Sequence, residues 1–585
     1  PSSILHPPFS ILHSPSSILH SPSSILHSPF SIPQKPHLYS LKFTYMVICP
    51  KNFKTFLLLL LSISTQILSS QPGIERSINP DYLLPDRYLY HPDANFHTSV
   101  RPYLRNEVNE VINYDSILLE QPLKSPWKGK TGEWIWKKVF HEDLIQITGK
   151  DFHFAVNPLV NFEIGRDFKN DDNAWVNTRG FMAEGNIGSK FFFATRFYEN
   201  QATFISYIDK DIQSKLVIPQ QGAYKRFKTD GYDFSRSEGY ISFSPNKYFN
   251  FRLGHGRNFF GDGYRSLLLG DAHFPYPYFL ISTQIWRIKY INLYAEFMDR
   301  KAPHSESLGY KKKYGTFHYL TTNITNRLKV GLFEAIIWQA EDSTGYRGFD
   351  FNYLNPIIFY RPVEFSLGSP DNALMGLNIS YTIGKKTAFY GQFLLDEFQL
   401  KEITSGKGWW ANKQAFQLGM KWFDIFHVAG LDFQSEVNVI RPYTYSHSDP
   451  ITNYGHYSEP LAHPLGANLV ESQNFVRYHH GRWHLTYQLQ RVQYGADTAG
   501  LNFGKDIFIS YSNHPFDYGN KIGQGLKTIL WRHDFKASWV INPAYNLNLS
   551  TGIVYRQLKT DLTNDQTLFI YIGLSTSLEK LYYDF

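Results

Sequence analysis

The sequence of 585 residues has almost no cysteine, since Cys49 is the only one. A single thiol excludes an internal disulfide framework and a zinc site built from cysteines. An excess of charge of one sign is also missing, because 58 Lys and Arg residues face 51 Asp and Glu residues. Four of the seven surplus positive charges are lysines in residues 1–70, which contain no acid, so the rest of the chain carries only +3. That charge is too small to indicate a nucleic-acid partner.

Long apolar runs are absent as well. After residue 70 no segment approaches the 18 or more consecutive apolar residues of a transmembrane helix. The apolar fraction of 43% is ordinary and excludes disorder for most of the chain. Aromatic residues, in contrast, are abundant at 17%.

The first 70 residues predict two segments that do not belong to the folded domain. Residues 4–31 repeat a seven-residue unit with a proline in every copy, and proline excludes a coiled coil. We interpret residues 1–45 as a low-complexity repeat that is untranslated in nature or disordered; its four histidines leave metal binding as the alternative. From Met46 onward, two lysines, a short apolar run over 56–61 and small polar residues predict a signal peptide over 46–70. The mature chain is then exported.

The rest of the chain is dominated by alternation of apolar and polar residues. In the segment 483–490, Trp, Leu, Tyr and Leu lie on one face and His, Thr, Gln and Gln on the other. The same period of two recurs over 377–383, 416–422, 431–439, 547–555 and 567–574. A soluble antiparallel sandwich would also alternate. Strands of eight to ten residues, polar on one face and rich in aromatics on the other, are more typical of a transmembrane barrel.

We therefore predict an all-β fold, a closed antiparallel transmembrane β-barrel over 151–585 with a polar, wet interior. Its length fits an even number of strands from 14 to 20, and about 18 strands would leave about 24 residues for each strand and its connection. Residues 71–150 form a small, partly helical periplasmic extension or plug, with a short helix expected after Pro102. The last alternating segment and the terminal Phe585 resemble the signal that the barrel-insertion machinery reads in outer-membrane proteins. The predicted location is the outer membrane, with surface-exposed loops.

The most distinctive stretch is 249–278, FNFRLGHGRNFFGDGYRSLLLGDAHFPYPY, in which a strand leads into a glycine-rich cluster of charged and aromatic residues. Together with the segments 351–364, 390–398, 408–413, 441–447, 453–457 and 461–468, it resembles the Wzi family of capsule-assembly barrels, and within it the RemB-type gliding-motility branch of Bacteroidetes-type bacteria. The resemblance covers roughly residues 150–585. It implies 18 strands, an N-terminal periplasmic helical element and association with surface polysaccharide.

The two candidate carboxylate pairs of the sequence do not have the spacing that glycoside hydrolysis requires. Asp396 and Glu397 are neighbours on a strand and face opposite sides, whereas Asp432 and Glu436 share a face about 13 Å apart. Glycoside hydrolysis needs about 5–9.5 Å between its carboxylates. The spacing of His447, His456 and His463 matches no compact zinc motif, so hydrogen-bonded loop histidines are the preferred interpretation over a metal site. We predict no enzyme activity, no metal and no cofactor.

Sugar binding needs aromatic faces for C–H surfaces and planar polar groups for hydroxyls, and arginine also pairs with carboxylates of uronic acids. The candidate glycan-binding residues are Arg252, His255, Arg257, Asp262, Tyr264, Arg265, Trp409, Trp410, Tyr443, Tyr445 and His447. The predicted function is binding or anchoring of surface polysaccharide. The alternative role of these residues is to hold the loops in shape. The alternative function of the protein is that of a gliding or adhesion component without glycan binding, or of a diffusion porin. The expected partners are polysaccharide, outer-membrane lipid and lipopolysaccharide, the insertion machinery and gliding adhesins.

Overall fold

The computed structural model describes residues 85–113, 123–300, 309–342, 345–359, 371–498 and 500–585. The predicted repeat over 1–45 and signal peptide over 46–70 lie outside these residues. No helix within the described part of the chain is long and apolar enough to cross a membrane.

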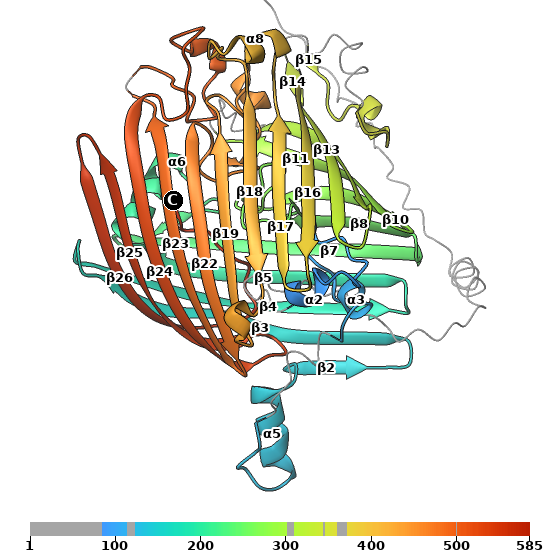
Figure 1. Cartoon of the computed structure of the whole chain (residues 1–585). Helices are drawn as coiled ribbons and strands as arrows, with labels where there is room; N and C mark the ends of the chain where they lie inside the picture. Colours follow the sequence, from blue (N-terminus) through green and yellow to red (C-terminus); the bar gives the residue numbers. More distant parts are fainter. Residues whose placement is uncertain (1–84, 114–122, 301–308, 343–344, 360–370, 499) are drawn as a thin grey trace, which may run out of the picture. The chain divides into compact units, whose positions relative to one another are not determined.

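Eighteen long antiparallel strands close into a barrel within the described residues, as predicted (Figure 1). Each strand pairs with the next along the chain, and β26 closes the barrel on β3 through pairs such as Ile572 with Ile164. The strands are β3 (Phe152–Asp167), β4 (Asp172–Ile187), β5 (Phe191–Thr203), β7 (Gly231–Asn246), β8 (Phe249–Gly256), β10 (Tyr276–Ile285), β11 (Ile288–Asp299), β12 (Lys311–Asn323), β13 (Leu328–Gln339), β16 (Asn372–Ile383), β17 (Thr387–Leu395), β18 (Gln414–Trp422), β19 (Leu431–Ile440), β22 (Leu469–His480), β23 (Trp483–Ala496), β24 (Leu526–Asn542), β25 (Leu547–Thr560) and β26 (Asn564–Ser575).

Alternation fixes which side chains face lipid. Leu418 on β18 is 69% exposed on the outer face, while its neighbour Gln417 is buried inside. Ile379 and Asn378 on β16 divide in the same way. Because successive residues of a strand point to opposite faces, one register places the apolar residues of each alternating stretch on the outer face. A closed barrel with an apolar outer surface satisfies its backbone in lipid, so the protein is an outer-membrane barrel.

The two ends of the barrel differ. At one end, here called the short-turn end, most connections take two to four residues, such as Gly481-Arg482 between β22 and β23, where Gly481 has a positive φ of 56°. At the opposite, long-loop end, segments such as 257–275, 396–413, 441–468 and 497–525 connect the strands. In outer-membrane barrels short turns face the periplasm and long loops face the exterior.

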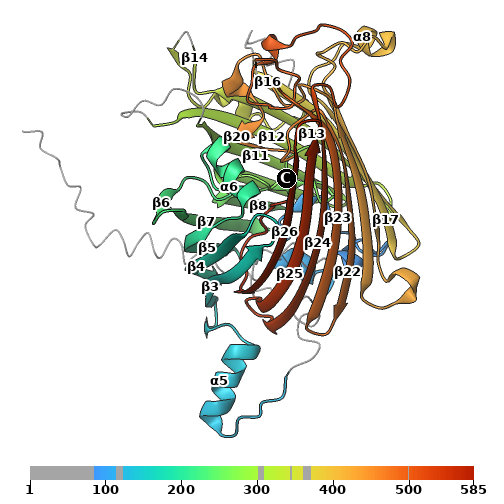
Figure 2. The same cartoon turned by 90° about the vertical axis from the view of Figure 1, so that its left-hand side faces the viewer.

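Short helices, 3₁₀ turns and short strands lie in the connections between the barrel strands and in the chain that precedes β3. The helices are α2 (Asp86–Leu89), α3 (Arg105–Asn109), α5 (Lys130–Phe140), α6 (Ser206–Lys215) and α8 (Leu400–Ser405), and the 3₁₀ turns are η1 (Phe351–Leu354), η2 (Ile425–His427), η3 (Pro450–Thr452) and η4 (Tyr511–Asn513). The short strands are β1 (Val100–Arg101), β2 (Ile145–Thr148), β6 (Lys225–Phe227), β9 (Phe259–Phe260), β14 (Glu341–Asp342), β15 (Gly345–Tyr346), β20 (Gly455–His456) and β21 (Glu459–Pro460). The helix expected after Pro102 corresponds to α3. The helix α5, which projects from the short-turn end in Figure 2, also lies in the segment 71–150 that was expected to be partly helical, although no helix was predicted at that position.

The N-terminal segment 85–113 lies against the inner faces of strands. The Lys421 ammonium of β18 contacts Asp86 at 2.7 Å, and Lys289 of β11 contacts Glu107 at 2.7 Å. Its strand β1 pairs with β9 of the 257–275 loop, which folds into the barrel from the other end. The segment therefore fills part of the lumen from the short-turn end.

Part of the lumen wall, on β12 and β13, is apolar and packed. The expectation of a polar, wet interior is wrong for this part of the barrel. Leu268, Tyr445 and Tyr454 from the inward loops pack with Phe317 and Phe333 on the inner faces of β12 and β13, all with little or no exposure. The loops that fold inward cover this part of the inner wall and exclude water from it. The apolar side chains of the wall and of the loops therefore form a hydrophobic core inside the barrel.

The chain beyond β26 also enters the barrel. The last strand ends at Ser575, and the tail 576–585 turns inward, so the C-terminus lies among the strands in Figure 1. The predicted final strand is confirmed, but the aromatic Phe585 lies ten residues beyond it. Its backbone carbonyl accepts a hydrogen bond from Arg556 at 2.9 Å, and Asp584 bonds to lumen residues, which explains why this segment leaves the sheet.

Candidate functional site

Nine of the eleven predicted glycan residues lie in three places: a buried network of hydrogen bonds and ion pairs inside the barrel, here called the tie (Asp262, Tyr264 and Arg265), a lumen cavity, and an aromatic cluster at the long-loop end. The tie is built on the 257–275 loop. The Asp262 carboxylate accepts hydrogen bonds from Tyr90, Thr98 and Asn378 at 2.6, 2.7 and 2.9 Å. Burial alone would raise the pKa of Asp262, but these hydrogen bonds lower it below its usual value, so the carboxylate stays charged.

Arg265 and Tyr264 belong to the same tie. The Arg265 guanidinium contacts Asp584 at 2.9 Å and Glu471 at 3.2 Å, with almost no exposure of any of the three side chains. The Tyr264 hydroxyl donates to Asp584 at 2.7 Å. Side chains in these contacts join the inward loop, β22 and the tail, so they hold the plugged lumen together.

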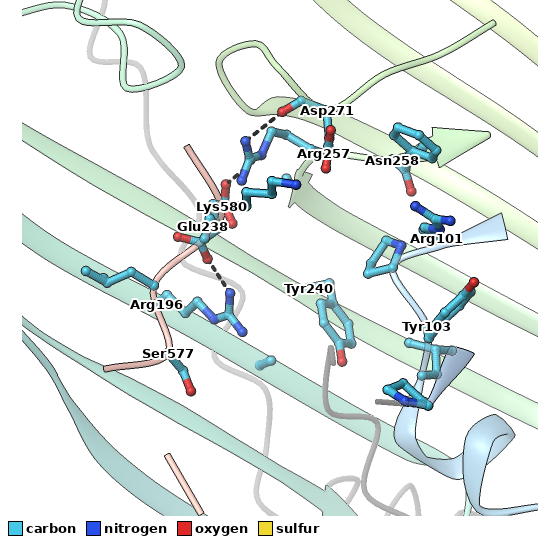
Figure 3. A pocket seen from close by; sticks show the side chains of 18 of the residues that line it. Arg101, Tyr103, Arg196, Glu238, Tyr240, Arg257, Asn258, Asp271, Ser577 and Lys580 are labelled. Carbon is cyan, nitrogen blue, oxygen red and sulfur yellow. Dashed lines mark hydrogen bonds and ion pairs between the residues drawn. The ribbon is translucent and has the colours of Figure 1, made fainter. Parts of the chain in front are cut away.

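A cavity of about 200 Å³ lies beside this tie, where the inner faces of β5, β7 and β8 meet the N-terminal segment, the inward loop and the tail (Figure 3). Tyr264 of the tie and three further predicted residues line it. Arg252 lies 4.9 Å over the ring of Tyr240, His255 has Nδ1 3.0 Å from the Ser237 carbonyl oxygen, and Arg257 donates to the Asp271 carbonyl oxygen at 2.6 Å.

The tail supplies further charge to this cavity. Glu579 forms an ion pair with Arg196 of β5, and the Lys580 ammonium lies 4.0 Å from the centre of the Tyr264 ring. Burial alone would raise the pKa of Glu579, yet Arg196 and Arg236 hold it well below its usual range. Arg196, Tyr240 and Lys580 were not among the predicted residues, because nothing local in the sequence places a strand or the tail beside the 257–275 loop.

A second cavity of about 390 Å³ adjoins the first. The two share Tyr264, Glu579 and Lys580 as lining residues. Its lining runs from Ile208 of α6, on the long-loop side, to Asn546 in a short turn.

The outer aromatic cluster, defined as Trp409, Trp410, Tyr443, Tyr511 and His514, joins the 396–413, 441–468 and 497–525 loops at the long-loop end. Trp410 stacks on His514 at 4.3 Å between ring centres and lies 4.8 Å from Tyr511. Trp409 and Tyr443 lie 6.0 and 6.1 Å from Trp410. Both tryptophans are half-buried, so each keeps part of its surface accessible to solvent.

The backbone holds the cluster in place. The 396–413 and 497–525 loops pair through Trp410 N to Asp517 O at 3.0 Å and Asn520 N to Gly408 O at 2.9 Å. Gly408 has a positive φ of 69°, and a Cβ there would meet Asn520 O at 2.8 Å, so glycine permits the close approach. Tyr511 and His514 were missed because they lie about 100 residues from Trp410.

The two remaining candidates lie deeper. The Tyr445 hydroxyl is buried and donates to the Leu267 carbonyl oxygen at 2.8 Å, which makes Tyr445 part of the core. His447 is buried below the outer cluster, with Nδ1 2.6 Å from Thr452 Oγ1 and its ring 5.7 Å from Tyr511. The described residues contain no group of three or more His, Cys, Asp or Glu placed to hold a metal ion.

No family model and no curated protein matches the chain. Among solved structures, the barrel is similar to Wzi, described as an outer-membrane protein involved in group 1 capsule assembly in Escherichia coli and a carbohydrate-binding β-barrel, with a TM-score of 0.51, 13% identity and coverage of 87% of this chain and 99% of that one. It also aligns with OprD of Pseudomonas aeruginosa (TM-score 0.40, 12% identity, 75% and 97% covered) and a BenF-like porin of Pseudomonas fluorescens (TM-score 0.40, 11% identity, 73% and 98% covered). At these identities the likeness to Wzi establishes the fold.

Proposed function

We propose that this protein is a non-enzymatic outer-membrane barrel that binds surface polysaccharide at its outer aromatic cluster. The observation that carries the proposal is the stacked group around Trp410, which two loops hold together at the long-loop end. Aromatic faces suit the C–H surfaces of sugars, and the half-buried tryptophans are rigid and accessible at once. The likeness to Wzi, itself described as carbohydrate binding, supports the same function.

The test is binding of the detergent-purified protein to a panel of capsular polysaccharides and exopolysaccharides, followed by tryptophan fluorescence. We expect Trp410→Ala to weaken binding at least tenfold, because it removes the ring on which His514 and Tyr511 pack. Trp286→Ala is the matched control, since Trp286 is 77% exposed in a short turn at the other end of the barrel. Equal affinity of both variants and the unaltered protein would remove the cluster as the site.

A diffusion channel is the second candidate, and the 390 Å³ cavity that runs toward both ends of the barrel favours it. The inward loops, the N-terminal segment and the tail oppose it, because they occupy the lumen. Planar-bilayer recordings separate the two functions. Polysaccharide binding without conductance supports the first, and large single-channel steps without binding support the second.

A role in gliding, as in RemB-type proteins, is a further proposal about the same barrel. In this role the barrel presents its long loops to moving adhesins. Deletion of the gene would then abolish colony spreading, and retention of polysaccharide on the cells would tell whether glycan binding contributes to that role.

A further inference from the structure

The 200 Å³ lumen cavity has a composition that the outer cluster does not share. Seven Lys and Arg residues line it, against five Asp and Glu residues. The cavity is far larger than the roughly 30 Å³ that one water occupies in the liquid. It therefore offers a positively charged space for a small molecule rather than for a single water.

The acidic side chains in the lining are already engaged by protein groups. Glu579 pairs with Arg196, and Asp86 pairs with Lys421. Glu238 pairs with Arg236, which lies behind the lining and is not part of it, and Glu238 Oε1 also lies 3.7 Å from Arg257 Nε. Arg236 thus neutralises part of the charge of this wall carboxylate from outside the cavity.

Several lining cations lie on aromatic faces. Arg252 covers the Tyr240 ring at 4.9 Å, and Arg101 lies 5.7 Å from the Tyr103 ring. Arg101 also has a buried Nε with no hydrogen-bond partner among the described residues. Figure 3 shows Arg101 and Tyr103 of the N-terminal segment, Tyr240 of β7 and Lys580 of the tail around the cavity. Such a wall combines planar donors for a carboxylate with ring faces for a saturated six-membered ring.

We propose that this cavity binds one acidic sugar residue of the uronic-acid class, with its carboxylate at Arg252 and Arg257 and its ring against Tyr240. The inference rests on the proposed polysaccharide function and adds to it a second, lumen subsite that selects the charge of the glycan. The adjoining 390 Å³ cavity, which shares Lys580 and Tyr264 with this one, connects the subsite with the rest of the lumen.

The experiment measures binding of glucuronate, glucose and inorganic phosphate to the detergent-purified full chain by saturation-transfer NMR and calorimetry. We expect saturable binding of glucuronate and at least tenfold weaker binding of glucose and phosphate. Arg252→Gln should weaken glucuronate binding at least tenfold. Arg287→Gln is the matched control, because Arg287 also lies on an aromatic ring, 5.7 Å from Trp286, but in a short turn outside the cavity.

The outcomes separate this inference from the proposed function. Loss of glucuronate binding in Arg252→Gln, with binding of long polysaccharide retained at the outer cluster, supports the subsite. No glucuronate binding by the unaltered protein, while long polysaccharide still binds, overturns the subsite alone. Phosphate binding as tight as glucuronate binding overturns the sugar assignment in favour of a simple anion site, and an unaffected Arg252→Gln variant overturns the location. Heat-modifiable migration on gels confirms that each variant is folded.

Discussion

At the scale of single residues, burial decides what a charged side chain does. Arg265 and Arg252 lie thirteen residues apart in the same glycine-rich stretch, and the sequence gives both the same chemistry. The structure puts Arg265 between two buried carboxylates and Arg252 on the wall of a cavity. Alternation along β8 predicts that Arg252 faces inward, but no local pattern predicts the partners of Arg265, which come from β22 and the tail.

Arg265→Leu should therefore destabilise the barrel strongly. The substitution leaves Glu471 and Asp584 buried without their shared guanidinium, a loss of about 3–5 kcal/mol for a broken buried pair. The measurement is the temperature at which the fast-migrating folded band converts to the slow band. Arg166→Leu is the control, since its pair with Asp171 is exposed and worth about 0–1 kcal/mol. Equal shifts for both variants would contradict the assigned role of Arg265.

His447 predicts a pH dependence. Burial, with help from Lys413, lowers the pKa of His447 from 6.5 to about 4. The unfolded loop therefore takes up a proton before the folded loop does, so the neutral ring stabilises the 441–468 loop above pH 6.5, and stability falls between pH 6.5 and 4, by up to about 3 kcal/mol. Hydrogen exchange in this loop should speed up across that range, and less so in His447→Gln. An identical pH profile in the variant would assign the effect to other groups, such as His456, whose pKa burial also lowers.

At the scale of elements, alternation predicts strands well and inward segments poorly. The strands over 377–383, 416–422 and 547–555 fall within β16, β18 and β25, with the predicted faces. The period of two reports burial on one face of a sheet, so it carries no information on loops that fold into the lumen. The tail shows the limit most clearly, because its aromatic residues suggest a strand end while Glu579 and Asp584 find partners inside the barrel.

Removal of the tail should open the lumen. Tail residues between 578 and 584 line the cavities, and Leu578, Glu579, Lys580 and Tyr582 line both, so a chain that ends at Ser577 should join the two spaces into one. We expect a severalfold rise in planar-bilayer conductance over the unaltered protein. Deletion of α8, an exposed helix with no buried residue, is the control and should leave conductance unchanged. A truncated barrel with unaltered conductance would show that the loops and the N-terminal segment alone close the passage.

At the scale of the whole molecule, one surface separates this barrel from a soluble β protein. The outer face carries exposed apolar residues on strand after strand, and such a surface is stable only against lipid. The fold class could be predicted because this constraint acts on every strand at once. The site could be predicted only in part, because it is assembled from loops that lie far apart in the sequence and meet only in the folded barrel.

Two leucines of equal exposure test this conclusion. Leu418 on β18 is 69% exposed and Leu400 in α8 is 68% exposed, so a soluble protein would tolerate arginine equally at both positions. In a membrane, Leu418→Arg places a charge against hydrocarbon and should cost about 2–4 kcal/mol if the residue lies near the bilayer midplane. Leu400→Arg lies at the long-loop end, in water, and should cost almost nothing. The measurement is folding into lipid vesicles over a urea series. Because the two substitutions are chemically the same, a difference between their midpoints reports the solvent around each leucine, and equal midpoints would place the outer face of β18 in water.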